Sequence, residues 1–421
     1  MLGLLSKDGF KVSDKFDSLD IAIVNTCAFI DDAKKESIDT VLQFIDLKKQ
    51  GKIKYLIVAG CLAQRYYPEL KSDMKEVDAF VGAGDFHRIK DIVKALLNEA
   101  PKDVVSARPA YIYNSKAPRA FITPRHYVYM KIQEGCKNMC SYCAIPSIRG
   151  PYRSRPMADI LAEAGSLNKD VMEVNIIGQD TTLYGVDLYK HKKLSALLGK
   201  LAVLGVFKWI RLLYTHPAHY TDELIRTVSD NSAICKYLDL PIQHINDKML
   251  KAMHRHTTKK EIISLIEKLK KNIPDLAIRT TFMVGFPGET EGEFKELRDF
   301  IEEAEFERMG VFLYSREEGT GAYNLSGQVP EKIKKARLNE IMKLQQAVSK
   351  RINEKFLNRR LDVLVDQVEN EKDGVYIGRT QFDAPEVDGQ VFVKGKNLKA
   401  GDFVKVRITD TLEYDLVGES L

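Results

Sequence analysis

EGCKNMCSYCAIP, residues 134–146, places Cys136, Cys140 and Cys143 within one short segment. Three thiolates this close together can bind three irons of a cubane 4Fe–4S cluster, which normally takes four cysteines. A structural zinc ion would need a closed set of four ligands, usually in pairs with shorter spacing, so zinc is the poorer interpretation. No fourth cysteine lies nearby. The segment therefore predicts a cluster with one iron open to an external ligand.

The composition is that of an ordinary soluble protein, with 44% hydrophobic and 29% charged residues among 421. No run approaches the roughly 18 apolar residues that a membrane span needs, and the first residues are too quickly charged for a secretory leader. Six cysteines with a clustered trio fit a reducing compartment and a metal rather than a disulfide framework. We expect a cytoplasmic protein with no membrane partner.

Residues 1–100 predict a parallel α/β sheet domain. Short apolar runs alternate with an amphipathic stretch, and a linker follows. The expected elements are strands at 21–27, 55–61 and 79–82, a helix at 31–50 and a linker at 101–126.

Cys27 and Cys61 each end one of these predicted strands, in "NTC" and "AGC". Parallel strands end at one edge of a sheet, where ligands bind in open α/β folds. Two such cysteines are also compatible with small, inert core residues. The start, "MLGLLSKDGF", resembles the back half of a helix with no preceding strand. We expect that a first strand, and a third cysteine with it, is missing from this domain.

Residues 127–330 predict an incomplete (β/α)6 barrel. A strand-then-helix pattern repeats six times, and the Cys136 segment follows the first strand, at the strand end where barrel active sites lie. The expected strands are 127–133, 173–179, 209–215, 237–243, 277–286 and 309–315.

The last part of the chain changes both charge and periodicity. Residues 331–360 predict a long basic helix with ten Lys and Arg against three Glu. Residues 361–421 predict five short strands in a small β-barrel of OB-like size, with seven Lys and Arg against thirteen Asp and Glu. Two oppositely charged regions suggest different partners, although both are also compatible with solvated surfaces.

Together these features resemble the methylthiotransferase family of radical S-adenosylmethionine enzymes, over essentially the whole chain. The resemblance implies an N-terminal cluster domain, a radical S-adenosylmethionine barrel and a C-terminal TRAM domain. It implies two 4Fe–4S clusters and S-adenosylmethionine as cofactors. Cys136, Cys140 and Cys143 match the radical-generating cluster, and Tyr142 matches the aromatic residue before its last ligand. Cys27 and Cys61 match two ligands of the auxiliary cluster, whose first ligand has no counterpart here, so this cluster is expected to be under-ligated.

Loops after other barrel strands are candidates for cofactor binding. "GQD" follows the second strand, where Gly178 permits close backbone approach and Gln179 and Asp180 can accept ammonium protons. A plain turn with Asp180 as a helix cap is about equally compatible. Gln243 follows the fourth strand and is a candidate for ribose or adenine contact. Gly285 and Gly288 belong to a "GFPGE" turn that we expect to line the cofactor.

The substrate is expected to be an aspartate of the small-subunit ribosomal protein S-twelve, modified at its β-carbon. "DAPEVDG" (383–389) resembles the RimO branch of the family, and a net negative 361–421 opposes RNA and suits a basic protein. Asp383, Glu386 and Asp388 are expected to be exposed together and to dock it.

Two alternatives remain open. One is methylthiolation of a modified adenosine in transfer RNA, supported by the basic helix. The other is a non-enzymatic iron–sulfur or RNA-binding protein. The expected partners also include a cellular electron donor, and we expect a monomer.

Overall fold

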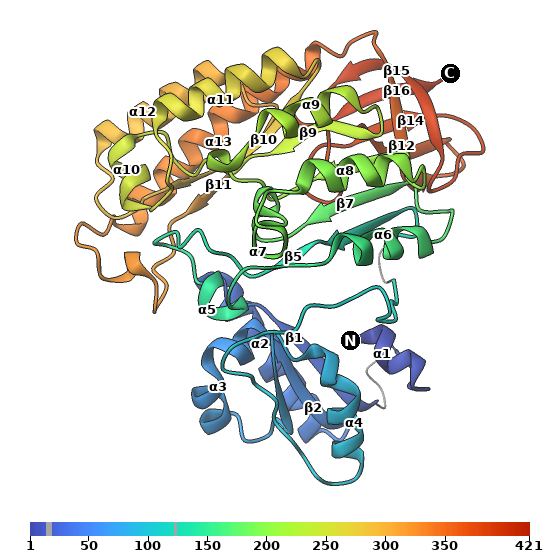
Figure 1. The fold of residues 1–421 in the computed structure, drawn as a ribbon, viewed down its shortest axis with the longest axis vertical. Helices are drawn as coiled ribbons and strands as arrows, with labels where there is room; N and C mark the ends of the chain where they lie inside the picture. Colours follow the sequence, from blue (N-terminus) through green and yellow to red (C-terminus); the bar gives the residue numbers. More distant parts are fainter. Residues whose placement is uncertain (14–18, 122–123) are drawn as a thin grey trace. The chain divides into compact units, whose positions relative to one another are not determined.

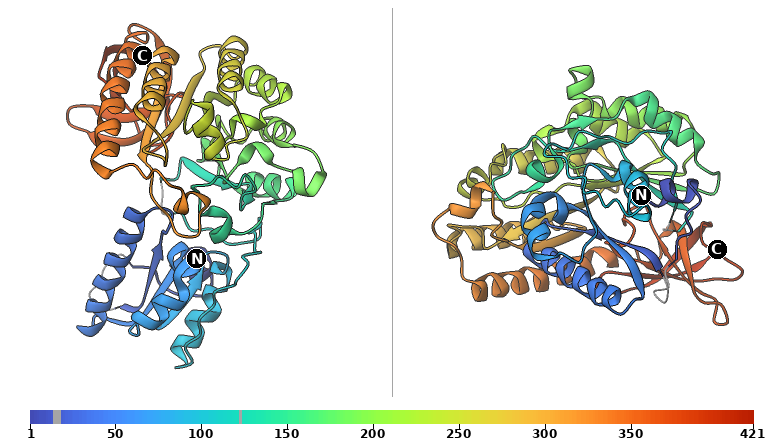
Figure 2. Two further views of the ribbon diagram at one scale, coloured as in Figure 1. Left: turned by 90° about the vertical axis from the view of Figure 1, so that its left-hand side faces the viewer. Right: turned by 90° about the horizontal axis from the view of Figure 1, so that it is seen from below.

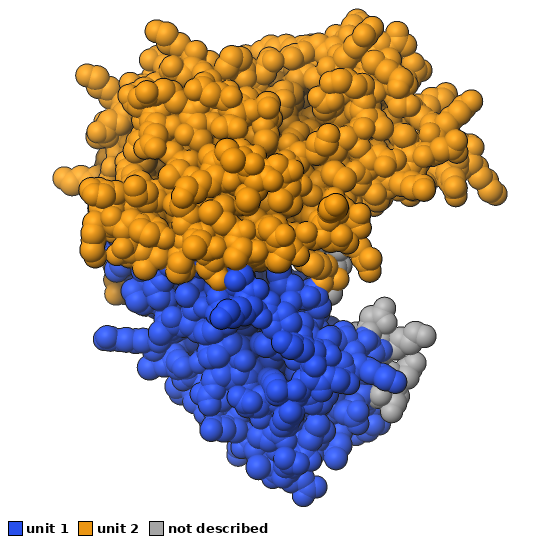
Figure 3. Space-filling view, turned by 45° about the vertical axis from the view of Figure 1, so that its right-hand side comes forward, with its two compact units in different colours: residues 1–120, 134–155, 315–323 blue, residues 121–133, 156–314, 324–421 orange. Residues whose placement is uncertain are grey.

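The chain forms two compact units in a computed structural model that describes residues 1–13, 19–121 and 124–421 (Figure 3). Residues 14–18, in the predicted N-terminal domain, and 122–123, in the predicted linker, lie outside the description. The first unit comprises residues 1–120, 134–155 and 315–323, and the second comprises 121–133, 156–314 and 324–421. The predicted domain boundary at residue 127 therefore does not coincide with the division between units, because the three-cysteine segment belongs to the first.

The first unit contains a three-stranded parallel sheet in the order β1-β2-β3 (Figure 1). The predicted βαβ pattern is confirmed, since buried aliphatic residues of β2 lie between α2 and α3 on one face and α4 on the other. The elements are α1 Leu2–Lys7, β1 Leu19–Thr26, α2 Asp31–Lys49, β2 Ile53–Gly60, α3 Cys61–Asp73, β3 Ala79–Gly82, α4 Ile89–Leu97 and, later in the chain, α5 Ile145–Arg149.

The second unit contains a six-stranded parallel sheet in the order β11-β10-β9-β8-β7-β4, with α6, α8, α9, α11, α12 and α13 packed on its outer face (Figures 1 and 2). The sheet is open, which confirms the incomplete barrel. The elements are β4 Tyr127–Lys131, α6 Met157–Ser166, β7 Glu173–Ile177, α7 Val186–Tyr189, α8 Leu194–Val203, β8 Trp209–Leu212, α9 Asp222–Asp230, β9 Ile234–Asp239, α10 Asp247–Ala252, α11 Lys259–Asn272, β10 Ala277–Val284, α12 Glu291–Ala304 and β11 Arg308–Leu313.

Strand β9 differs from the predicted 237–243, since it begins at Ile234 and ends at Asp239. Pro241 explains the earlier end, because proline has no N–H to donate to a neighbouring strand in the interior of a sheet. The chain touches the sheet once more through an isolated bridge between Gln243 and Phe282.

Helix α13, Glu331–Glu354, leads into a closed five-stranded barrel, as predicted. The barrel order is β12-β13-β14-β16-β15, and its strands are β12 Arg360–Asn370, β13 Val375–Arg379, β14 Val391–Lys394, β15 Phe403–Thr411 and β16 Leu416–Ser420. No helix in the described ranges is long and apolar enough to cross a membrane.

The inner face of the open sheet is closed by this small barrel through buried charges. Arg211 of β8 donates to Glu173 of β7 at 2.7 Å, and Arg379 of β13 donates to the other oxygen of Glu173 at 2.6 Å. Arg379 also donates to Asp366, which accepts from His126 at 2.8 Å when that ring nitrogen carries a proton. Burial would raise the pKa of Glu173, but the charges of Arg379 and Arg211 together hold this pKa below its usual value. The carboxylate therefore stays ionised inside the protein.

A second set of buried charges involves the loop after β13. Asp383 accepts from Arg308 of β11 at 2.7 Å. Asp388 accepts from Tyr237 of β9 at 2.6 Å and from Arg279 of β10 at 3.3 Å. The loop thus neutralises two arginines that β10 and β11 place on the inner face, and it accepts a hydrogen bond from a tyrosine of β9.

The expected exposure of Asp383, Glu386 and Asp388 as one group is wrong. Asp383 is 2% exposed and the Asp388 side chain 4%. Glu386 lies at the surface but accepts from Tyr127 Oη at 2.7 Å. The reason is that the segment inserts against arginines of the central barrel that no sequence pattern revealed. Asp383 and Asp388 hold the fold together, and we do not propose them for docking.

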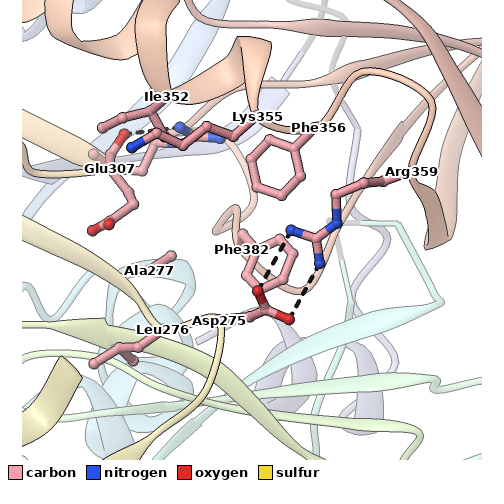
Figure 4. Close-up of a pocket in the computed structure, with 10 residues that line it drawn as sticks. Asp275, Leu276, Ala277, Glu307, Ile352, Lys355, Phe356, Arg359 and Phe382 are labelled. Carbon is pink, nitrogen blue, oxygen red and sulfur yellow. Dashed lines mark hydrogen bonds and ion pairs between the residues drawn. The ribbon is translucent and has the colours of Figure 1, made fainter. Parts of the chain in front are cut away.

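The same loop also makes an aromatic contact with the end of α13. Phe382 faces Phe356 with ring centroids 5.5 Å apart, beside a cavity of about 140 Å³ (Figure 4). Arg359 and Asp275 line one side of this cavity, where Arg359 donates to Asp275 at 3.2 Å. The loop is therefore fixed by apolar and ionic contacts together.

Replacing Asp383 by Asn should destabilise the second unit, because Arg308 would remain buried without its counter-charge. Removing one partner of a buried ion pair costs about 3–5 kcal/mol. Trp209, the only tryptophan in the chain, lies at this interface with its ring 4.7 Å from that of Phe403, so its fluorescence during urea unfolding reports the loss.

Glu413→Gln in the same small barrel is the matched control, because Glu413 is exposed. Its unfolding free energy should stay within about 0.5 kcal/mol of the wild type. An Asp383→Asn protein as stable as this control would show that the Arg308–Asp383 pair contributes nothing.

Candidate functional site

The three-cysteine segment lies wholly in the first unit, directly before α5. Cys136, Cys140 and Cys143 are each partly exposed. The Cys143 N–H donates to the Cys140 carbonyl at 3.1 Å, which closes a turn between the last two thiols. The Ser141 carbonyl accepts from the Ala322 N–H at 2.7 Å and anchors the turn to residues 315–323. The segment is thus a fixed loop of three partly exposed cysteines.

These three thiols have the chemistry that a cubane cluster requires. Each iron of such a cluster takes one thiolate, so the sulfurs need not converge on a point. Among the described residues, no three or more His, Cys, Asp or Glu side chains form a group that could hold a metal ion. Partial exposure leaves access for an external ligand. The donor set fits a cluster with three ligated irons, and this ligation stays a prediction.

Cys27 and Cys61 are brought together at one edge of the β1-β2-β3 sheet. The last register pair of β1 and β2 is Thr26 with Gly60, so each cysteine comes directly after it. Ser37 fixes Cys27 by accepting from its N–H at 2.9 Å and donating to its carbonyl at 3.0 Å.

Cys61 is the more buried of these two thiols. Burial raises its pKa, Arg149 lowers it and the neighbouring Cys27 raises it further. The two thiols therefore lie within electrostatic range of each other, as two ligands of one centre must. Their role as iron ligands stays a prediction.

The end of β7 in the second unit carries a tight contact and two unsatisfied amides. A Cβ on Gly178 would lie 2.5 Å from Gln133 Nε2, so only glycine fits there. Gln133 and Asn175 are both fully buried, and neither atom of either amide has a hydrogen-bond partner among the described residues. Buried polar groups normally have partners, so these amides fit contact with water or a polar ligand. No sequence pattern indicated either residue, because both resemble ordinary polar residues of a strand.

Asp180 is buried and already has partners. Its carboxylate accepts from His219 Nδ1 at 2.9 Å, in the tautomer that carries that proton, and from the Thr182 N–H at 3.0 Å. Burial would raise its pKa, but the His219 contact and charge lower it to about 2. Asp180 also caps the short helix Thr181–Leu183. The predicted turn is thus present, and ammonium binding by Asp180 stays a prediction.

His216 is a neutral hydrogen-bond donor beside the Asp180–His219 pair. Its ring stacks on His219 at 4.7 Å, and its Nδ1 accepts from the Ala218 N–H at 3.3 Å, so the proton is on Nε2. Nε2 is buried and has no partner among the described residues. Burial, followed by the charge of Arg255, lowers the pKa of His216 to about 2. Buried Arg255 is a further charged residue that no sequence pattern indicated.

Gln243 has a positive φ of 73°, which is unusual for a residue other than glycine. Its N–H donates to the Thr281 carbonyl at 2.8 Å, and its own carbonyl accepts from the Met283 N–H at 2.8 Å. Such strain concentrates at functional sites. Gln243, Tyr142 and Gln179 are partly exposed, and their cofactor roles stay predictions.

Gly285 and Gly288 are explained by local geometry. Both have positive φ, 77° and 82°, and a Cβ on Gly285 would lie 2.3 Å from the Lys334 side chain. Glu289 closes the turn by accepting from the Gly285 N–H at 2.6 Å. The positive φ at both positions, with the Lys334 contact at Gly285, accounts for the glycines without a ligand, and their contact with the cofactor stays a prediction.

Three family descriptions match successive parts of the chain. Residues 130–301 match the Radical SAM superfamily, residues 359–421 match the TRAM domain, and residues 1–82 match the uncharacterized protein family UPF0004. These matches divide the chain in the order predicted for the three parts.

Similar proteins share the full length of the chain. It is 47% identical over 423 residues to the ribosomal protein uS12 methylthiotransferase RimO of Clostridioides difficile (strain 630), covering 100% of this chain and 95% of that protein. The protein of the same name from Thermoanaerobacter sp. (strain X514) is 47% identical, with the same coverage. Among solved structures, the radical S-adenosylmethionine methyltransferase TsrM of Kitasatospora setae aligns with a TM-score of 0.55 and 14% identity, over 74% of this chain and 64% of that one. This structural likeness supports the fold alone.

Replacing His216 by Gln should remove part of the acid sensitivity of the second unit. The folded pKa of about 2 lies below the ordinary 6.5, so between these values only the unfolded chain takes up the proton. The free energy of unfolding of the wild-type protein should therefore fall as the pH drops below about 6.5, by up to about 1.4 kcal/mol per pH unit. Urea unfolding followed by Trp209 fluorescence at pH 7, 6 and 5 measures this slope.

His191→Gln is the control, because His191 is exposed. It should keep the wild-type pH dependence. If His216→Gln keeps it as well, the buried imidazole is not the source of the acid sensitivity.

Proposed function

The chain belongs to the family of ribosomal protein uS12 methylthiotransferases named RimO, and from this we propose that it inserts a methylthio group at the β-carbon of an aspartate of ribosomal protein uS12. The observation that carries the proposal is 47% identity over the whole chain, together with three partly exposed cysteines in one fixed loop. The reaction class is the transfer of a methylthio group by a radical S-adenosylmethionine enzyme.

Cys136, Cys140 and Cys143 would hold the cluster that initiates the reaction. When bound, this cluster supplies the electron that cleaves S-adenosylmethionine to methionine and a 5′-deoxyadenosyl radical. The protein's contribution is to fix the three thiols and to leave one coordination position for the cofactor. The turn from Cys140 to Cys143 and the Ser141–Ala322 contact support this role.

The methionyl part of the cofactor is an α-amino acid with one charge of each sign. Asp180 and Arg255 are both buried and carry opposite charges. Both act on His216, because the charge of Arg255 lowers the pKa of this imidazole and that of Asp180 raises it. We assign ammonium recognition to Asp180 and carboxylate recognition to Arg255. The unsatisfied amide of Gln133, which lies against Gly178, would bind a further polar group.

Cys27 and Cys61 would supply two ligands of a second, auxiliary cluster that handles sulfur. Their position at adjacent strand ends supports this assignment. Two clusters per chain, of which the auxiliary one is under-ligated, make up the proposed cofactor set together with S-adenosylmethionine. A ribosomal substrate fits a cytoplasmic enzyme that receives electrons from a cellular donor, and we propose that it works as a monomer.

The choice of uS12 rests on family membership and not on charge. Asp366, Asp383 and Asp388 contribute to the acidity of 361–421, yet arginines inside the same unit neutralise them. The surface of the small barrel is therefore less acidic than its composition indicates.

Transfer RNA is the second candidate substrate, favoured by one surface of α13. Lys332, Lys335, Lys343 and Lys350 are exposed and recur along the helix. Such a stripe can contact phosphates, although it also suits a solvated helix.

Replacing Cys136, Cys140 and Cys143 by Ala should abolish formation of 5′-deoxyadenosine by reduced, reconstituted protein. The physical reason is that no cluster remains to donate the electron. Chromatography of anaerobic reactions measures the product. Cys235→Ala is the matched control, because Cys235 is fully buried in the second unit. It should retain cleavage, and cleavage by the triple variant would disprove the assignment.

Parallel reactions with purified uS12 and with transfer RNA decide which of the two is the substrate. We expect a mass increase of one methylthio group on a uS12 aspartate and none on the RNA. Lys343→Glu should leave uS12 modification unchanged within about twofold, because exposed charges act weakly and are screened by salt. If only the transfer RNA is modified, then transfer RNA and not uS12 is the substrate.

A further inference from the structure

Tyr214 comes shortly after strand β8, in a backbone conformation that side chains rarely adopt. Its φ is 57°, and a bulky residue in this left-handed region is strained. Its N–H donates to Asp239 Oδ2 at 2.8 Å, and its carbonyl accepts from the Thr181 N–H at 2.9 Å. Asp239 ends β9 and Thr181 comes after β7, so the chain on both sides of β8 holds Tyr214 in this conformation. Strain of this kind concentrates at functional sites.

The side chain of Tyr214 lies beside the inner face of the open sheet. Partial burial raises the pKa of Tyr214, the charge of Asp239 raises it further and the charge of Arg279 lowers it, so its hydroxyl lies within electrostatic range of both. Arg279 is an inner-face residue, because it donates to Asp388 of the loop after β13. Although its backbone is fixed, Tyr214 is 50% exposed. The fold therefore spends strain on a ring that faces solvent.

A second exposed aromatic residue, Phe312 of β11, lies on the same face. Side chains alternate between the two faces of a strand, and Arg308 of β11 points inward to Asp383. Phe312 has the same parity as Arg308, so it also points inward, and it is 53% exposed. Its register partner on β10 is Met283, which is partly exposed. Two neighbouring strands thus leave apolar side chains uncovered on the inner face.

Tyr214, Met283 and Phe312 make up what we call the exposed apolar set. They come from the carboxyl-terminal parts of β10 and β11 and from the segment after β8. Tyrosine, phenylalanine and methionine are enriched in the cores of protein interfaces, where charged residues are depleted. Exposed apolar side chains that share one face are typical of an interaction site. The exposed apolar set therefore has the composition of a contact surface.

The charges of the inner face favour a polypeptide as the partner. Four arginines on this face each donate to a carboxylate of the same unit, namely Arg211, Arg279, Arg308 and Arg379. Binding of RNA draws much of its affinity from Lys and Arg that meet phosphates, and a neutralised arginine adds little. A polypeptide needs no such charge, because buried aromatic side chains carry much of the affinity of protein interfaces.

We propose that the exposed apolar set is the contact surface for the polypeptide substrate, and that Tyr214 is held in its strained conformation to present its ring to that polypeptide. The inference rests on the proposed function, because the partner is uS12. It adds the surface that receives the protein and the residue that the fold strains for this purpose. The contact is one of binding and requires no bound cofactor.

Replacing Tyr214 by Gly separates the contact from the fold. Glycine adopts a positive φ without strain, so the midpoint of urea unfolding, followed by Trp209 fluorescence, should be no lower than that of the wild type. Binding of purified, labelled uS12 to the full chain, measured by fluorescence anisotropy, should weaken about tenfold or more, because a buried aromatic contact is lost. Phe312→Ser should weaken binding in the same way.

Val203→Ser is the matched control, because Val203 is an apolar residue of the same unit that is 88% exposed, on helix α8 of the outer face. It should bind uS12 within about twofold of the wild type. If Tyr214→Gly and Phe312→Ser bind uS12 as tightly as this control, the inference is overturned. If Tyr214→Gly loses stability as well as binding, Phe312→Ser decides: weaker binding at unchanged stability supports the surface, and unchanged binding overturns it.

The same titrations with transfer RNA test the choice of partner. A wild-type protein that binds transfer RNA through Tyr214 and Phe312, and not uS12, would overturn the assignment of this surface to a polypeptide. A wild-type protein that neither binds nor modifies uS12 would refute the proposed function. By contrast, a wild-type protein that modifies uS12 while both variants bind it normally would overturn the inference and leave the proposed function intact.

Discussion

Buried arginines on the inner face of an open barrel are the constraint on which the second unit depends. A buried charge without a partner costs several kcal/mol, so Arg211 cannot be left in the interior of the sheet alone. Glu173 from the next strand meets it, and Arg379 of the small barrel meets Glu173 in turn. The small barrel therefore completes the charge pairing of the inner face, and removing it would take Arg379 from Glu173 and Asp383 from Arg308.

The sequence was sufficient for the order and type of elements, because parallel strands and amphipathic helices have local periodicity. Strand β9 was predicted to run past its end at Asp239 because its apolar run continues through Pro241. The acids of 383–388 were misjudged for a different reason. Their composition indicates a solvated loop, whereas Arg308 and Arg279, distant in sequence, pair with them. Long-range pairing of charges has no periodic signal.

The same limit applies to the candidate site. The thiols could be predicted because cluster ligands need a fixed spacing, and glycine turns because few residues adopt a positive φ. Gln133 and Asn175 gave no signal, since a glutamine or asparagine in a strand reads as an ordinary polar residue. Only the structure shows that both amides are buried without a partner among the described residues, in contrast to Asp180, whose oxygens are satisfied.

The connections of the open sheet explain why both cysteine groups belong to one unit. β4 and β11 are the two edge strands of the sheet, and the chain leaves each of them for a segment of the first unit, 134–155 and 315–323. Glu317 anchors the second segment by accepting from Arg65 at 2.7 Å and from Lys34 at 3.0 Å, and it is 1% exposed. The three-cysteine loop is thus built on the N-terminal sheet, although it follows a barrel strand in sequence. Its geometry, and with it the distance between the two groups of thiols, is set by packing inside a single unit.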